Sequence, residues 1–121
     1  MADTTRAAQR LITSGTMHRH PGLRVILPHG GGYLPYIGTR LARFYYDTAQ
    51  PTSPSATPSL LGYAGPDRIL YGTDYALAPA WIFGVVNELI DADPVLTDPL
   101  RAAMYRENAL RLLPSVAARL G

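Results

Sequence analysis

Hydrophobic positions along the chain follow two alternating patterns. Short apolar runs cover residues 24–28, 44–48 and 68–71, and the first is typical of a strand buried on both faces of a parallel sheet. Between and after these runs, apolar residues recur every three or four positions, as they do in amphipathic helices. This order of strands and helices predicts an α/β fold with about three parallel strands and right-handed crossovers.

Residues that typically begin or end helices narrow the bounds of the predicted helices. Helices are predicted over residues 3–14, 34–43, 79–92, 99–105 and 107–113, followed by a last turn or two to Leu120. Gly15 is placed to end the first helix. Residues 50–59, rich in proline, serine and threonine, are predicted to form a loop in which Ser53 caps and Pro54 opens a short helix.

Length and composition limit the class of protein. The 121 residues suffice for one domain (1–121), and 47% hydrophobic residues exclude a disordered tail. The longest apolar stretch, residues 75–90, is broken by Pro79, Asn87 and Glu88, so no membrane span is expected. The absence of cysteine excludes disulfides and thiolate metal sites, and no signal peptide pattern is present. We expect a cytoplasmic protein.

The charge does not indicate a polyanion partner. The formal net charge is +2, and all eleven basic residues are arginines spread from Arg6 to Arg119 without a dense run. Because nucleic-acid binders usually concentrate basic residues on one face, no nucleic-acid partner is expected.

Polar side chains follow each of the three predicted strands. His29 comes after the first strand, Asp47 and Thr48 after the second, and Thr73 and Asp74 after the third. The carboxyl ends of parallel strands lie at one edge of a sheet, where α/β enzymes place their sites. We call this edge the rim. An imidazole and a carboxylate on the rim can be ligands of zinc, manganese or iron. Alternatively, the imidazole can serve as a general base beside a carboxylate that binds the metal.

Not every polar residue at this rim needs a chemical role. Asp47 is more simply interpreted as the cap of a turn. His29 and Asp74 have glycines beside them, which let a ligand approach the backbone closely. The pair His18 and His20 resembles a metal-binding motif, but it lies before the first strand and is better explained as a solvated turn.

Two other features resemble functional signals. Residues 29–32, HGGG, match the oxyanion motif of some esterases, but the chain has no G-x-S-x-G elbow and no histidine after His29. This excludes a Ser-His-Asp esterase in this chain by itself. Tyr33, Tyr75 and Trp81 flank the rim and could line an aromatic substrate, although packing is the simpler interpretation.

Three motifs together resemble a known family. They are LPHGGG at residues 27–32, FYYDTA at 44–49 and DRILYGTDY at 67–75, and DTTRA at 3–7 and ENALRLL at 107–113 add to them. In this order they resemble the amidohydrolase superfamily, and most closely its amidohydrolase-2 branch of aminocarboxymuconate-semialdehyde-decarboxylase-like proteins. The similarity extends over nearly the whole chain.

The resemblance implies a metal-dependent (β/α)₈ barrel, of which this chain matches the C-terminal portion. It implies that His29 acts on the metal-bound water or the substrate, and that Asp74 is a catalytic metal ligand. The expected cofactor is a divalent metal, with zinc first, held in a site that is incomplete in this chain. The family's other metal-binding histidines have no counterpart here. Gly31, Gly32 and Tyr75 are expected to bind substrate.

The implied activity is that of a decarboxylase or hydrolase acting on small aromatic or enol-type carboxylic acids. A (β/α)₈ barrel needs about 250 residues. We therefore expect the chain to act as a homo-oligomer or with a separate N-terminal half. The alternative is a non-catalytic remnant, or a subunit of a split protein, that acts by association through its open sheet.

Overall fold

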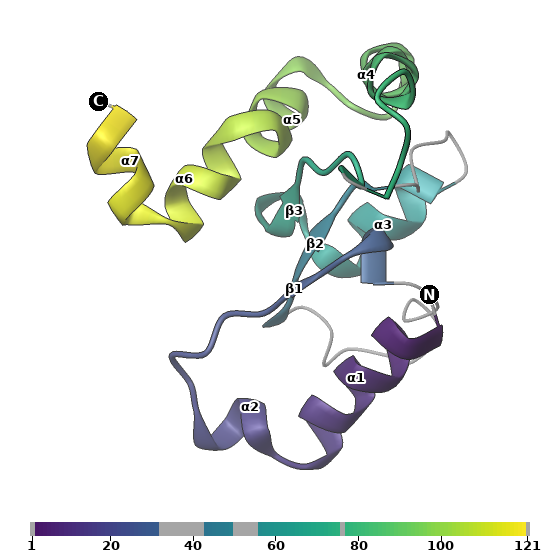
Figure 1. Ribbon diagram of the computed structural model, residues 1–121. Helices are drawn as coiled ribbons and strands as arrows, with labels where there is room; N and C mark the ends of the chain where they lie inside the picture. The colour runs from purple at the N-terminus through teal and green to yellow at the C-terminus, as the bar shows by residue number, and fades with distance from the viewer. Residues whose placement is uncertain (1, 32–42, 50–55, 76, 121) are drawn as a thin grey trace.

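A three-stranded parallel sheet forms the centre of the protein (Figure 1). The computed structural model describes residues 2–31, 43–49, 56–75 and 77–120. The strands are β1 (Ile26–Leu27), β2 (Tyr45–Asp47) and β3 (Ile69–Leu70), in the order β1-β2-β3. All three apolar runs of the sequence thus become strands, which confirms the predicted sheet.

Helices precede, connect and follow the strands. They are α1 (Ala2–Thr13), α2 (Thr16–Arg19), the short η1 (His29–Gly31), α3 (Ala56–Ala64), η4 (Pro66–Arg68), α4 (Ile82–Ala92), α5 (Asp98–Ala102), the π-helical η5 (Ala103–Glu107), α6 (Asn108–Leu112) and α7 (Pro114–Leu120). Gly15, at a φ of 72°, follows the first helix as predicted. The helix predicted over residues 34–43, and the predicted cap and start at Ser53 and Pro54, lie outside the described residues.

The core lies between the sheet and the helices on its two sides. Figure 1 shows α1 and α2 on the β1 side, and α5, α6 and α7 on the β3 side. Phe44 and Tyr46 are fully buried at the centre, since the aromatic second strand is the middle strand. The cluster packed around them contains Ala8, Met17, Leu27, Leu60, Ala64, Ile69, Val86, Ile90, Leu96 and Met104.

The first strand is less buried than its sequence predicts. Leu27 is 4% exposed, but the neighbouring Ile26 is 46% exposed. Successive side chains of a strand point to opposite faces, and β1 is an edge strand whose second face is left open by the described part of the chain. The prediction of a strand buried on both faces is therefore wrong for β1.

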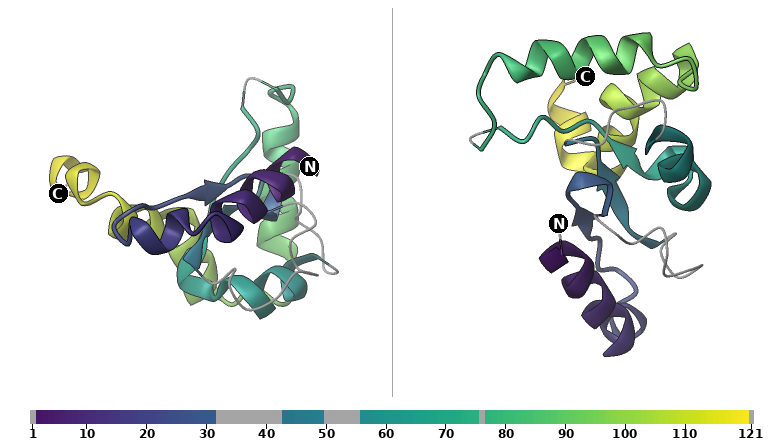
Figure 2. Two further views of the ribbon diagram at one scale, coloured as in Figure 1. Left: turned by 90° about the horizontal axis from the view of Figure 1, so that it is seen from below. Right: turned by 90° about the vertical axis from the view of Figure 1, so that its right-hand side faces the viewer.

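The helix α4 also has an open apolar face. Figure 2 shows α4 at the end of the molecule remote from α1 and α2. On and before it, Trp81 is 69% exposed, Val85 42% and Leu89 45%. No helix in the described part of the chain is long and apolar enough to span a membrane. The exposure of Trp81, Val85 and Leu89 marks a surface that lacks a packing partner among the described elements.

Candidate functional site

His29 and Asp74 lie next to each other at the carboxyl ends of the strands. His29 follows β1 and Asp74 follows β3. The Nε2 atom of His29 is 3.5 Å from the Oδ1 atom of Asp74, and the two side chains are only 20% and 16% exposed. The parallel sheet therefore brings together the imidazole and the carboxylate that the sequence singled out.

Both residues have an unusual backbone conformation. The φ angle is 59° at His29 and 60° at Asp74, in the left-handed region that side chains other than glycine seldom adopt. Gly30, at a φ of 56°, continues the left-handed turn after His29. Such conformations persist where the surrounding structure holds them, and they are concentrated at functional sites.

Asp47 holds the backbone of His29 in this conformation. Its Oδ1 atom accepts a hydrogen bond from the His29 N–H at 2.8 Å and another from the Ala49 N–H at 3.2 Å. Burial is the main cause that raises the pKa of Asp47 above its ordinary value. The bond to Ala49 agrees with the interpretation of Asp47 as a turn cap. The bond to His29 adds a link between the ends of β1 and β2.

Thr48 anchors the segment that leads to Asp74. Its backbone N–H donates to the Leu70 carbonyl at 3.0 Å, and its Oγ1 accepts from the Gly72 N–H at 3.1 Å. The Thr48 hydroxyl also lies 3.3 Å from the Gly72 carbonyl, to which it donates. These bonds extend the pairing of β2 and β3 beyond the strands and bring Gly72 against Asp47.

Gly72 leaves no room for a side chain. A Cβ atom at this position would lie 2.9 Å from the Cβ atom of Asp47. We expect Gly72→Ala to lower the free energy of unfolding by about 1–3 kcal/mol, the usual cost of overpacking, measured by urea denaturation. Gly62→Ala is the control, because a Cβ at Gly62 meets nothing within 4 Å and alanine favours its helix. Equal stability of the two variants would contradict the close contact.

Tyr63 holds the glycine loop from the other side. Its hydroxyl donates to the Gly30 carbonyl at 2.5 Å, and its ring packs edge-on against Tyr46 with centroids 5.3 Å apart. Burial raises the pKa of Tyr63 to about 12, so the hydroxyl stays protonated near neutral pH. The sequence does not indicate a role for Tyr63, because nothing in the local pattern of α3 predicts a contact with the loop after β1.

Of the predicted substrate-binding residues, the structure describes Gly31 and Tyr75. Gly31 ends η1 beside His29, whereas Gly32 and Tyr33 lie outside the described residues. Tyr75 follows Asp74 directly but is 80% exposed, with its ring centroid 6.0 Å from that of Phe83. Tyr75 thus packs against Phe83 at the surface, and Trp81 is also largely exposed, so neither ring is part of the core.

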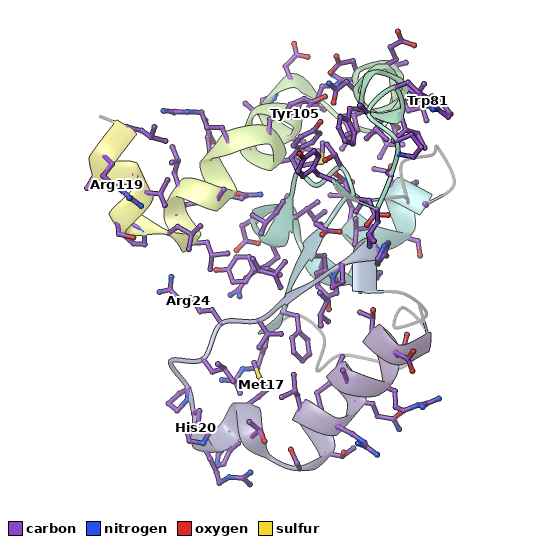
Figure 3. All side chains as sticks on the ribbon, in the orientation of Figure 1. Met17, His20, Arg24, Trp81, Tyr105 and Arg119 are labelled. Carbon is purple, nitrogen blue, oxygen red and sulfur yellow. The ribbon has the colours of Figure 1, made fainter. Side chains whose placement is uncertain are left out.

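His18 and His20 lie away from this site. His18 is in α2 and His20 directly follows it, and both are exposed. Figure 3 shows His20 near α2, at the opposite end of the molecule from Trp81. Both histidines precede β1 and are exposed to solvent, as predicted, but His18 lies in the short helix α2 rather than in a turn.

The side chains of His29 and Asp74 fit a part of a metal site. The Nδ1 atom of His29 is buried and has no hydrogen-bond partner among the described residues. Within those residues, no group of three or more histidine, cysteine, aspartate or glutamate side chains gathers to hold a metal ion. Because a zinc site normally has three or four protein ligands, this pair can supply only part of one.

Sequence comparison finds relatives of known activity. The sequence profile of the amidohydrolase family matches residues 1–115. A 6-methylsalicylic acid decarboxylase of Aspergillus aculeatus is 31% identical, over 93% of this chain and 42% of its own length. A 6-methylsalicylic acid decarboxylase of Penicillium expansum is 34% identical, over 64% of this chain and 31% of its own length. The chain thus spans less than half the length of these curated relatives.

Solved structures share the fold. The crystal structure of an amidohydrolase II matches with a TM-score of 0.85 and 26% identity, over 93% of this chain and 42% of that one. A dihydroxybenzoic acid decarboxylase of Polaromonas sp. JS666, with bound manganese and the inhibitor 2-nitroresorcinol, matches with a TM-score of 0.78 and 22% identity, over 91% and 39%. These neighbours are (β/α)₈ barrels, so the predicted fold class is confirmed.

Proposed function

Because the chain belongs to the amidohydrolase family, we propose that it forms part of a metal-dependent decarboxylase acting on small aromatic carboxylic acids. The observation that carries the proposal is the pairing of His29 and Asp74, 3.5 Å apart at the carboxyl ends of the strands. The activity of the curated relatives favours decarboxylation over the hydrolysis that the family resemblance left open.

His29 and Asp74 would share the chemistry as follows. Asp74 would be a ligand of a divalent cation, which when bound stabilises the negative charge that develops as carbon dioxide leaves. His29 would orient the polar groups of the substrate or transfer, at Nε2, the proton that replaces the carboxylate on the ring carbon. Asp47 and Tyr63 hold the His29 loop through its backbone, so they would act as positioning residues.

The substrate would lie against the rim beside these two residues. Gly31 and Gly32 would let it approach the backbone closely, since glycine has no side chain. The exposed ring of Tyr75 would pack against an aromatic substrate.

The site would be completed outside this chain. Asp74 by itself does not make a zinc site, so the remaining ligands would come from an N-terminal half of the barrel or from a second copy. Zinc and manganese are the candidate metals. The alternative is a non-catalytic subunit that acts by association, which the exposed Ile26 of the edge strand β1 and the exposed face of α4 favour.

The experiment supplies the missing half of the barrel. The chain is co-expressed with the part of the Aspergillus aculeatus relative that it does not cover, and carbon dioxide release from 6-methylsalicylate and 2,6-dihydroxybenzoate is measured. We expect release by the assembly that is abolished by a chelator and restored by zinc or manganese, and no release by the chain alone.

The two metals are added back separately, and the better one identifies the cofactor. A folded assembly that contains both parts but releases no carbon dioxide with either metal would contradict the proposed decarboxylase activity. It would favour the alternative role as a non-catalytic subunit.

A further inference from the structure

Each of the three strands is preceded by an arginine. Arg24 and Arg43 lie two residues before β1 and β2, and Arg68 lies one residue before β3. Because the strands are parallel, their starts share one edge of the sheet, opposite the edge that holds His29 and Asp74. The pairing of Ile26 with Tyr45 brings Arg24 level with Arg43. The fold therefore gathers arginines that are far apart in the sequence.

These arginines line a cavity of about 310 Å³. Arg24, Arg43 and Arg68 are joined there by Arg111 from α6, together with Met17 of α2. Among the described residues that line the cavity there is no aspartate or glutamate. Figure 3 shows Arg24 and Met17 on the side of the sheet remote from Trp81.

Contacts with neutral groups hold three of the guanidinium groups in place. Arg24 donates to the Leu112 carbonyl at 2.8 Å, and Arg111 donates to the side-chain oxygen of Asn108. The guanidinium of Arg68 lies 4.7 Å from the centre of the Tyr45 ring. These contacts order the side chains but leave their positive charges in place.

Among the described residues, Asp67 forms an ion pair with an arginine of the cavity. Asp67 is 3.4 Å from Arg68, but its side chain is 65% exposed. An ion pair so open to water contributes little, because solvent screens the attraction. The four arginines of the cavity thus repel one another with little internal compensation, and an anion in the cavity would relieve this repulsion.

We propose that this cavity binds a small oxyanion that carries at least two negative charges. Guanidinium groups form paired hydrogen bonds to phosphate and carboxylate oxygens, and the described lining offers four of them. The cavity volume is at the lower end of the range for small-ligand pockets. The site is separate from that of His29 and Asp74, since the two lie at opposite ends of the strands, and it does not depend on the proposed decarboxylase activity.

The test uses isothermal titration calorimetry on the 121-residue chain at a fixed ionic strength. The probes are pyrophosphate and citrate, and the one that binds more tightly shows whether phosphate or carboxylate chemistry is preferred. We expect at least one of them to bind, and Arg68→Gln to weaken its binding at least tenfold through loss of charge-assisted hydrogen bonds. Tyr45→Leu, which keeps the net charge, is expected to weaken binding about two- to fivefold by removing the ring under Arg68.

The control is Arg6→Gln, which removes the same charge from an exposed position on α1. It is expected to change binding less than twofold. Circular dichroism checks that each variant is folded, and Arg43→Gln, at an exposed position, replaces Arg68→Gln if the latter unfolds. Failure of both probes to bind, or equal weakening by Arg6→Gln, would overturn the proposal.

Discussion

Replacing His29 with asparagine is expected to lower turnover by roughly a hundredfold or more, the usual contribution of a positioned acid–base group. The measurement is kcat for carbon dioxide release by the assembly that completes the barrel. Asparagine keeps some hydrogen bonding but lacks the basic nitrogen of the imidazole. It also tolerates the left-handed conformation of this position, at a φ of 59°, so the loop should keep its shape.

The matched controls are His18→Asn and His20→Asn. Both residues are exposed and precede β1, so the same substitution there is expected to change neither kcat nor stability by much. If the control variants lost activity while His29→Asn stayed active, the assignment of the site to the carboxyl ends of the strands would be wrong.

Replacing Asp74 with asparagine is expected to lower metal occupancy and turnover together, each at least tenfold. The substitution keeps the shape of the side chain and removes the negative charge that a divalent cation requires of its ligand. Elemental analysis of the dialysed assembly measures the metal, and the same preparation is assayed for carbon dioxide release. Asparagine is again compatible with the local backbone, at a φ of 60°.

Asp3→Asn serves as the control for Asp74→Asn, because the Asp3 side chain is 95% exposed on α1. It is expected to leave both metal content and turnover unchanged. An Asp74→Asn assembly that kept its metal but lost its turnover would show that Asp74 is not a ligand. It would leave the pairing with His29 as the reason for its importance.

The apolar pattern along the chain predicts the three strands and the longer helices, and it places His29 and Asp74 at one edge of the sheet. It does not predict the short helix α2 or the π-helical η5. The apolar runs and helical periods are local properties, and the chain order of parallel strands places residues such as His29 and Asp74 at one edge whatever the details of packing. The sequence also separates His29 and Asp74 from His18 and His20. The latter two precede the first predicted strand, whereas His29 and Asp74 each follow a strand.

Contacts between elements cannot be predicted from the local sequence, because they depend on how the elements pack. The hydrogen bond from the His29 N–H to Asp47 depends on the register of the strands. The hydrogen bond from the Tyr63 hydroxyl to the Gly30 carbonyl depends on where α3 packs. Neither contact produces a pattern of apolar and polar residues in the sequence. The exposure of Ile26 depends in the same way on which face of the sheet is covered. The arginines before the strands, spread along the chain, form one cavity because parallel pairing brings the starts of distant strands together.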